Sequence, residues 1–108
     1  MLPKINRLTK KSDFDLVFKK GKSTKSDFLI FKELKNHLKI ARFGFVVSKK
    51  VSNKATVRNA VKRKLRAAVA KQLNGFKKPA DIIMIALSGI VKKEFLEIQK
   101  TVADYLKK

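Results

Sequence analysis

Residues Lys54 to Arg66 read K-A-T-V-R-N-A-V-K-R-K-L-R, and this stretch organises both the fold and the charge of the chain. At about 100° per residue, an apolar stripe runs along the helix that begins here. The stripe consists of Val57, Val61, Leu65, Ala68 and Val69. The pattern predicts a helix that starts near Ala55 or Thr56 and runs to about Leu73, where Asn74-Gly75 ends it.

The same predicted helix carries a cationic face beside the apolar stripe. Arg58, Lys62 and Arg66 recur every four residues, so their side chains stack along one side of the helix. Asn59 and Arg63 lie beside them. Like charges at this spacing destabilise an isolated helix by roughly 0.2 to 0.5 kcal/mol per pair. The face therefore predicts a polyanionic partner, and the alternative is a solvated helix face.

Arginine is concentrated in this segment. Only five of the 28 basic residues are arginine, and three of these fall within the nine positions from Arg58 to Arg66. A guanidinium offers phosphate a planar fork of donors, whereas the lysine ammonium is a flexible point charge. The use of arginine here indicates shaped recognition of an anion.

The composition favours nucleic acid as the partner. The chain has 108 residues, 44% of them hydrophobic, which suits a single domain, residues 1–108, with a modest core. Its formal net charge of +20 exceeds what solubility requires. The absence of cysteine excludes disulfides and thiolate metal sites. Without an apolar run of membrane-spanning length or a signal peptide, the chain is expected to be cytoplasmic, with no membrane partner.

A helix is predicted over residues 10–20. Its apolar positions at helical spacing are Phe14, Val17 and Phe18. Ser12 or Asp13 is expected as the N-cap, and Gly21 is expected to end the helix.

Strands and a last helix are predicted around the central helix. Residues 28–31 and 40–48 are rich in β-forming side chains and are expected to pair as antiparallel strands. Residues 81–87 are almost continuously apolar, which is typical of a strand in the middle of a sheet with both faces covered. Apolar side chains at steps of three and four predict a helix over residues 92–106. The result is a small layered α/β domain.

Several motifs in order resemble those of the protein subunit of bacterial ribonuclease P. The first is Arg7-Leu8 followed by Phe14 and Phe18, and the second is G-F-V-V-S-K-K-V at residues 44–51. The third is R-N-A-V-K-R-K-L-R at residues 58–66. The resemblance spans nearly the whole chain, although Ala67 and residues 88–91 depart from what many members carry.

The resemblance implies a function. The subunit would bind the catalytic RNA and the 5′ leader of precursor tRNA and promote endonucleolytic removal of the leader, which gives the mature tRNA 5′ end. Mg²⁺ would be bound by the RNA component, and the protein alone would be inactive. No protein partner is implied.

The resemblance also implies a fold. This is a small α-β sandwich of order α-β-β-β-α-β-α, related to a ribosomal-protein domain, with a left-handed β-α-β crossover. General rules favour a right-handed connection in about 98% of cases, so the handedness rests on the resemblance alone.

Two groups of site residues are expected. The catalytic RNA is expected to contact Lys54, Arg58, Asn59, Lys62, Arg63 and Arg66. The leader is expected to contact Phe14, Phe18, Phe31, Ser48, Lys49 and Lys50. Aromatic side chains close to lysines can bind a single strand, because the rings stack on bases and the lysines contact phosphates. The alternative for each phenylalanine is that it packs in the hydrophobic core. For Ser48 to Lys50 the alternative is a solvated turn.

Protein-based catalysis has little support in the sequence. His37 is the only histidine, so paired-imidazole chemistry and a histidine-based metal site are excluded. Asp13 and Asp15 lie two residues apart on a helix and point away from each other. Two other readings stay open: a ribosomal-protein-like structural binder of rRNA, and a histone-like DNA-binding protein.

Overall fold

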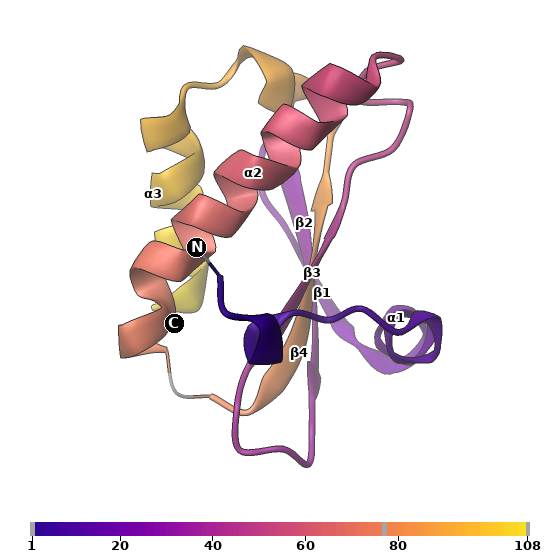
Figure 1. Ribbon diagram of the computed structural model, residues 1–108, viewed down its shortest axis with the longest axis vertical. Coiled ribbons are helices and arrows are strands. Elements are labelled where there is room, and N and C mark those ends of the chain that lie inside the picture. The colour runs from indigo at the N-terminus through magenta and orange to yellow at the C-terminus, as the bar shows by residue number, and fades with distance from the viewer. Residues whose placement is uncertain (1, 77, 108) are drawn as a thin grey trace.

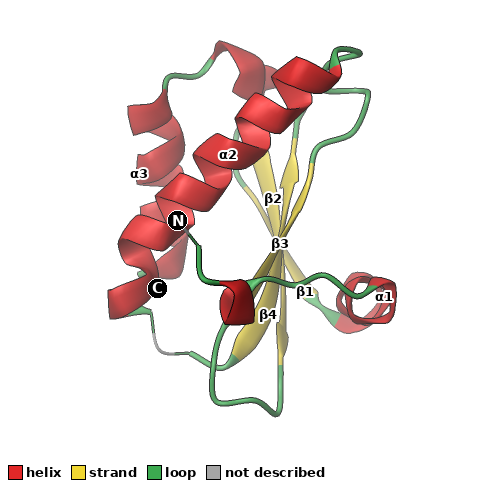
Figure 2. Ribbon diagram, in the orientation of Figure 1, coloured by secondary structure: helices red, strands yellow, loops and turns green. Residues whose placement is uncertain are grey.

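The computed structural model describes residues 2–76 and 78–107. Its elements follow the predicted order of helix, three strands, helix, strand and helix (Figure 1, Figure 2). They are α1 (Lys11–Lys20), β1 (Lys22–Lys25), β2 (Leu29–Lys35), β3 (Arg42–Val46), α2 (Ala55–Gln72), β4 (Ala80–Ala86) and α3 (Phe95–Leu106). Short 3₁₀ turns are formed by Lys4–Asn6, Leu73–Gly75 and Ser88–Lys92. The predicted mixed α and β fold class is confirmed.

The four strands form one sheet in the order β1-β2-β4-β3. β2 pairs antiparallel with both β1 and β4, whereas β3 pairs parallel with β4. The expected antiparallel pair between residues 28–31 and 40–48 is therefore wrong, because β4 lies between β2 and β3. The central place of β4 is confirmed, since its apolar side chains are buried on both faces of the sheet.

The parallel neighbours β3 and β4 are joined through α2, so the three elements form a β-α-β unit. Its left-handed sense stays a prediction.

The helices are divided between the two faces of the sheet (Figure 1). α2 and α3 cover one face and enclose the main core, which includes Phe43, Ile82 and Met84 from the strands. α1 lies on the other face, where Val17 packs with Leu8 and Ile83 in a second, smaller cluster. A ligand can therefore approach α1 and α2 from different sides of the molecule.

The central helix agrees closely with its prediction. It begins at Ala55 and ends at Gln72, one residue before the predicted end. Val61, Leu65, Ala68 and Val69 are buried against the core. The stripe in the sequence therefore located both the helix and its buried side.

The start of α1 differs from its prediction. Lys10 occupies the N-cap position and makes no capping bond through its side chain, so the predicted Ser12 or Asp13 cap is wrong. Asp13 lies in the first turn, and its Oδ2 is 3.3 Å from Nη1 of Arg42. Gly21 ends the helix as predicted, and its N–H donates to the Val17 carbonyl at 2.7 Å. α3 begins at Phe95 and not at Lys92, because residues 88–92 form a 3₁₀ turn.

A close approach of α1 to β3 requires a glycine. A Cβ atom at Gly44 would lie 2.5 Å from Cζ of Phe14. Only a residue without a side chain leaves room for this ring. Gly44 therefore fixes how deeply the Phe14 ring seats on the sheet.

Candidate nucleic-acid interface

The cationic side of α2 is presented as the sequence predicts. Asn59, Arg63 and Arg66 are exposed, and Arg58 and Lys62 are half-buried at the edge of the apolar stripe. The exposed Lys54 occupies the N-cap position of the helix. We call these six residues the α2 cationic face. The structure brings all of them together on one helix and its first flanking position.

Arg58 has a structural contact that the sequence does not reveal. Its Nη1 donates to the carbonyl oxygens of Ser52 and Asn53, both at 3.0 Å. The guanidinium thus fastens the segment before α2 to the helix, while its other N–H groups remain available as donors.

Arg66 lies over an aromatic ring of the sheet. Its Cζ is 5.9 Å from the centroid of Phe45, a half-buried residue of β3. This cation–π contact restricts the guanidinium without using its hydrogen-bond donors. Arg66 is therefore partly ordered before any ligand binds.

Two of the three predicted leader-contacting rings lie together on α1. Phe18 is 40% exposed, and Nζ of Lys32 is 5.9 Å from its ring centroid. Phe14 is half-buried and packs against the smaller core cluster. An exposed ring beside an ammonium group is suited to a base and its phosphate.

The expectation for Phe31 is wrong in this structure. The residue is 1% exposed and belongs to the main core, on the face of the sheet opposite α1. Its ring stacks on Tyr105, with centroids 4.0 Å apart and planes 3° apart. A ring so enclosed has no free surface for a base.

The sequence analysis missed the strand residues beside Phe18. β2 alternates, so Ile30 and Lys32 point to the α1 side while Phe31 points away. The register places Ile30 opposite Ile85, and Val46 pairs with Ile85 from the other side. We call Phe14, Phe18, Ile30, Lys32, Val46 and Ile85 the α1 face. The period of two in β2 was the available signal.

Ser48, Lys49 and Lys50 lie in the turn that leads from β3 to α2, and all three are exposed. The hydroxyl of Ser48 accepts a hydrogen bond from the N–H of Lys50 at 3.3 Å. Its carbonyl accepts another from the N–H of Val51 at 3.0 Å. Ser48 therefore shapes a turn that holds two lysines in solvent.

A partly buried set of ion pairs holds α1 and two strands together. Arg42 donates to Asp81 through Nε and Nη2, at 2.8 and 2.7 Å, and Asn36 donates to the same carboxylate at 2.8 Å. The hydrogen bond to Asp81 raises the pKa of Arg42, against the opposing effect of burial. Arg42 therefore stabilises the fold by joining β3 to β4.

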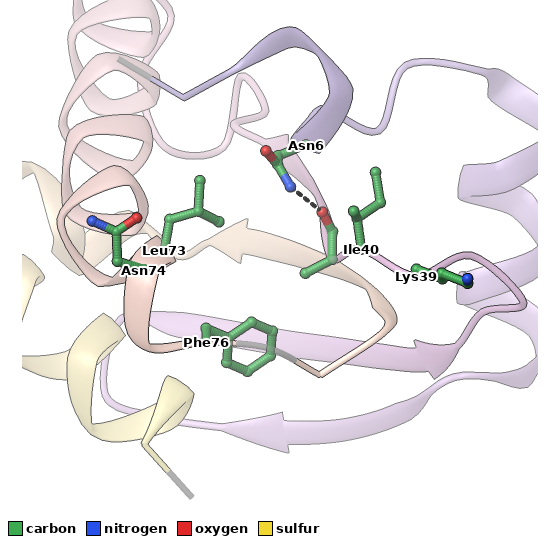
Figure 3. Close-up of a pocket in the computed structure, with 7 residues that line it drawn as sticks. Asn6, Lys39, Ile40, Leu73, Asn74 and Phe76 are labelled. Carbon is green, nitrogen blue, oxygen red and sulfur yellow. Dashed lines mark hydrogen bonds between the residues drawn. The ribbon is translucent and has the colours of Figure 1, made fainter.

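A pocket of about 390 Å³ lies near the end of α2 and contains none of the predicted site residues (Figure 3). Asn6 borders it and donates from Nδ2 to the Ala41 carbonyl at 2.8 Å, and Phe76 lines the opposite side. Over residues 2–76 and 78–107, no cluster of three or more histidine, cysteine or acidic side chains is arranged to hold a metal ion. Within the same ranges, no helix is long and apolar enough to cross a membrane.

The fold and its two cation-bearing surfaces define a small, strongly basic α-β protein of the RNA-binding class. The family model for Ribonuclease P matches residues 2–108, and the chain belongs to this family. The family resemblance seen in the sequence is confirmed. The chain is thus a component of an RNA-processing endonuclease complex that acts in tRNA processing, with the ribonuclease P RNA as its partner.

Curated relatives carry the same description. The ribonuclease P protein component of Syntrophomonas wolfei is 37% identical over 108 residues, which cover 100% of this chain and 90% of the relative. That of Legionella pneumophila is 43% identical over 96 residues, covering 88% of this chain and 81% of the relative.

Solved structures agree with the fold. A Staphylococcus aureus RNase P protein mutant with defective mRNA degradation activity aligns with a TM-score of 0.88 at 30% identity, covering 96% of this chain and 87% of that one. The Thermotoga maritima RNase P protein in complex with 1-(4-fluorophenyl)-2-thiourea gives a TM-score of 0.86 at 31% identity, covering 94% and 98%.

Proposed function

We propose that this chain binds the catalytic RNA of ribonuclease P through the α2 cationic face and the 5′ leader of precursor tRNA through the α1 face. The observation that carries the proposal is the separation of these two surfaces by the sheet. One protein can then hold the RNA and the leader at the same time. Holding both promotes removal of the leader by positioning, since a bound substrate reacts as part of the same assembly.

The α2 cationic face suits a folded RNA. A rigid helix presents Arg63 and Arg66 at fixed spacing, and phosphate contacts of this kind set orientation without reading sequence. Arg58 contributes twice, because it also braces the segment that carries Lys54.

The α1 face suits an unpaired strand. Phe18 offers a base a stacking surface, and Lys32 stands beside it to meet a phosphate. Half-buried Ile30, Val46 and Ile85 continue an apolar surface on the strands. Lys49 and Lys50 extend the positive charge from the end of β3 towards α2.

In this proposal the protein breaks no bond. The reaction uses Mg²⁺ held by the RNA, and the protein contributes binding and orientation.

Reconstitution tests this function. The chain is mixed with ribonuclease P RNA and a 5′-labelled precursor tRNA at low magnesium, where we expect it to increase leader removal and to bind precursor more tightly than mature tRNA. A chain that leaves both quantities unchanged would refute the proposal. Equal affinity for precursor and mature tRNA would favour a ribosomal-protein-like structural binder.

A protein-only arm belongs in the same experiment. The solved structure of the Staphylococcus aureus mutant is described by a defect in mRNA degradation activity. The chain alone is therefore incubated with precursor tRNA and with an mRNA. We expect neither to be cut, and cleavage that survives further purification would contradict an RNA-only catalyst.

A further inference from the structure

A pocket of about 470 Å³ lies on the face of the sheet opposite α1, outside both proposed RNA surfaces. Strands β1 and β2, the segment before β4 and the last turn of α3 meet there. Its volume is within the range of small-molecule sites. Of the residues that the structure describes, the lysines that line it are Lys22, Lys35 and Lys78.

The strand register explains why the lysines converge. Lys22 lies directly opposite Glu33 in the β1–β2 ladder. Lys35 lies two residues after Glu33 on β2, so its side chain points to the same face of the sheet. Lys35 in turn pairs with Ala80, the first residue of β4, so the preceding Lys78 arrives at the same end of the sheet. Three separate segments thus deliver an ammonium group to one place.

The charges in this pocket are not balanced. Among the described residues that line it, Glu33 is the only one with a carboxylate, and it forms an ion pair with Lys78. Among the described residues, no carboxylate lies within ion-pair distance of Lys22 or Lys35. Two uncompensated cations in a concave site attract an anion.

Aromatic rings border the lysines. Tyr105 is held by stacking on Phe31 and by a hydrogen bond from its hydroxyl to Oε1 of Glu33 at 2.7 Å. Phe76 lies across the pocket and packs at a tilt on Phe43, with centroids 5.9 Å apart. Fixed rings beside lysines are the combination with which proteins hold an unpaired nucleotide.

An adjoining pocket of about 280 Å³ extends the site and shares Thr24 and Tyr105 with it. Thr101, Asp27 and Asp104 line this extension, together with Lys25 and with Ser26, whose hydroxyl is bonded to the backbone of Leu29. The Thr101 hydroxyl and the two carboxylates suit the hydroxyls of a sugar and the edge of a base, and two carboxylates beside one lysine disfavour a second phosphate. The two pockets together match one phosphate with one nucleoside.

We propose that Lys22 and Lys35 bind the phosphate of a nucleoside monophosphate unit, either free or as an unpaired residue of an RNA strand, with its base against Tyr105. This site is a third surface and is independent of the proposed function. The pocket near the end of α2 shares Phe76, but Lys39 is the one lysine among the described residues that line it (Figure 3).

The test is a titration of the ¹⁵N-labelled full-length chain with AMP, followed by amide chemical shifts. We expect saturable shifts at Lys22, Thr24 and Tyr105, with adenosine and inorganic phosphate each binding at least about tenfold more weakly, because each supplies half of the contacts. Shifts confined to α1 or α2, or no saturable binding, would overturn the proposal.

Paired variants separate this site from general charge. Lys22→Gln with Lys35→Gln should weaken AMP at least about tenfold, whereas Lys4→Gln with Lys100→Gln, two exposed lysines outside the pocket, should change it less than about twofold. Equal losses from the two pairs would contradict a built site. Tyr105→Phe, which keeps the ring, should bind AMP better than Tyr105→Leu, and the reverse order would also contradict it.

Two further arms identify the source of the nucleotide and isolate the proposal. A five-nucleotide single strand that binds much more tightly than AMP, through the same lysines, identifies an RNA strand, and equal affinities identify a free nucleotide. Assembly with ribonuclease P RNA is measured on the same variants. Variants that lose AMP binding but still assemble with ribonuclease P RNA support this site, and this result does not depend on whether the α2 cationic face binds that RNA.

Discussion

Arg42 and Asp81 face each other across the parallel pair β3 and β4, joined by two hydrogen bonds of 2.7 and 2.8 Å. The Asp81 side chain is only 8% exposed, so it depends on this partner. Removing one member of a buried pair leaves an uncompensated charge. The pair therefore couples the β-α-β unit to α1 through the third contact, from Arg42 to Asp13.

Replacing Arg42 should destabilise the fold strongly. For Arg42→Ala we expect the free energy of unfolding to fall by about 2 to 3 kcal/mol, because the buried Asp81 loses its cation and keeps only the hydrogen bond from Asn36. Urea denaturation measures the change. The control is Glu97→Ala, which removes an exposed pair with Lys93, leaves Lys93 over the Phe28 ring and should cost less than about 1 kcal/mol. Similar losses in the two variants would show that the buried pair has no special weight.

Gly44 should be sensitive to substitution because the Phe14 ring of α1 packs on it, and Gly89 serves as the control. Gly44→Ala places a methyl group 2.5 Å from the Phe14 ring, and we expect a loss of about 1 to 3 kcal/mol of stability and weaker leader binding. Gly89→Ala meets no atom within 4 Å and should be close to neutral. Thermal unfolding and leader affinity are measured for both. A neutral Gly44→Ala would mean that Phe14 moves away at no cost.

Phe18 and Phe31 should separate binding from stability. Phe18→Ala is expected to weaken leader binding by about 1 to 3 kcal/mol, as for a lost stacking ring, with little change in unfolding. Phe31→Ala removes a buried ring and should cost about 3 to 5 kcal/mol of stability. Equilibrium unfolding and binding of a labelled leader give the two quantities. Equal stability losses would place Phe18 in the core.

The salt dependence of RNA binding should report the α2 cationic face. If binding of the folded catalytic RNA neutralises about six phosphates and follows the coefficient of a double helix, the logarithm of the association constant falls with the logarithm of salt concentration at a slope near −5. For Arg63→Ala with Arg66→Ala we expect the slope to shrink by about 1 to 2. Titrations at several salt concentrations measure it, with Lys4→Ala and Lys100→Ala together as the control for the loss of two charges. An unchanged slope would remove these arginines from the interface.

Tyr105 should make stability depend on alkaline pH. Burial, followed by the hydrogen bond to Glu33, raises the pKa of the phenol in the folded chain. The unfolded chain then loses this proton near pH 10 while the folded chain keeps it. The contribution of Tyr105 to the free energy of unfolding is therefore complete below that pH and decreases above it. Unfolding is measured from pH 8 to 11 for the chain and for Tyr105→Phe, which lacks the proton. The difference between the two cancels lysine titration, and a flat difference would contradict the shifted pKa.

Local patterns in the sequence predicted local structure well. The period of Val61, Leu65 and Ala68 located α2 and its buried side, because helix contacts repeat every three or four residues. The apolar run of β4 located the central strand for a similar reason. The four-residue spacing of Arg58, Lys62 and Arg66 located the cationic face on α2.

Choices between distant partners were harder to predict. β2 pairs with β4 and not with β3, because β4 inserts between them in the sheet. The alternation of side chains within β2 or β3 does not reveal which strand will be its neighbour. Phe18 and Phe31 are both phenylalanines close to lysines in the sequence, so the sequence alone does not separate them. The alternation of side chains along β2 places Phe31 in the main core. The hydrogen bonds from Arg58 to the carbonyl oxygens of Ser52 and Asn53 could not be predicted, because composition and spacing do not give the path of the backbone before α2.

The central strand of the sheet is the last strand to be synthesised. Until Ala86 leaves the ribosome, β2 and β3 have no common neighbour, and α2 has only part of the surface on which it packs. A nascent chain that stops before β4 therefore carries the arginine-rich segment without a folded support. Cotranslational folding of this protein must wait for nearly the whole polypeptide, during which its unshielded positive charge is open to any RNA nearby.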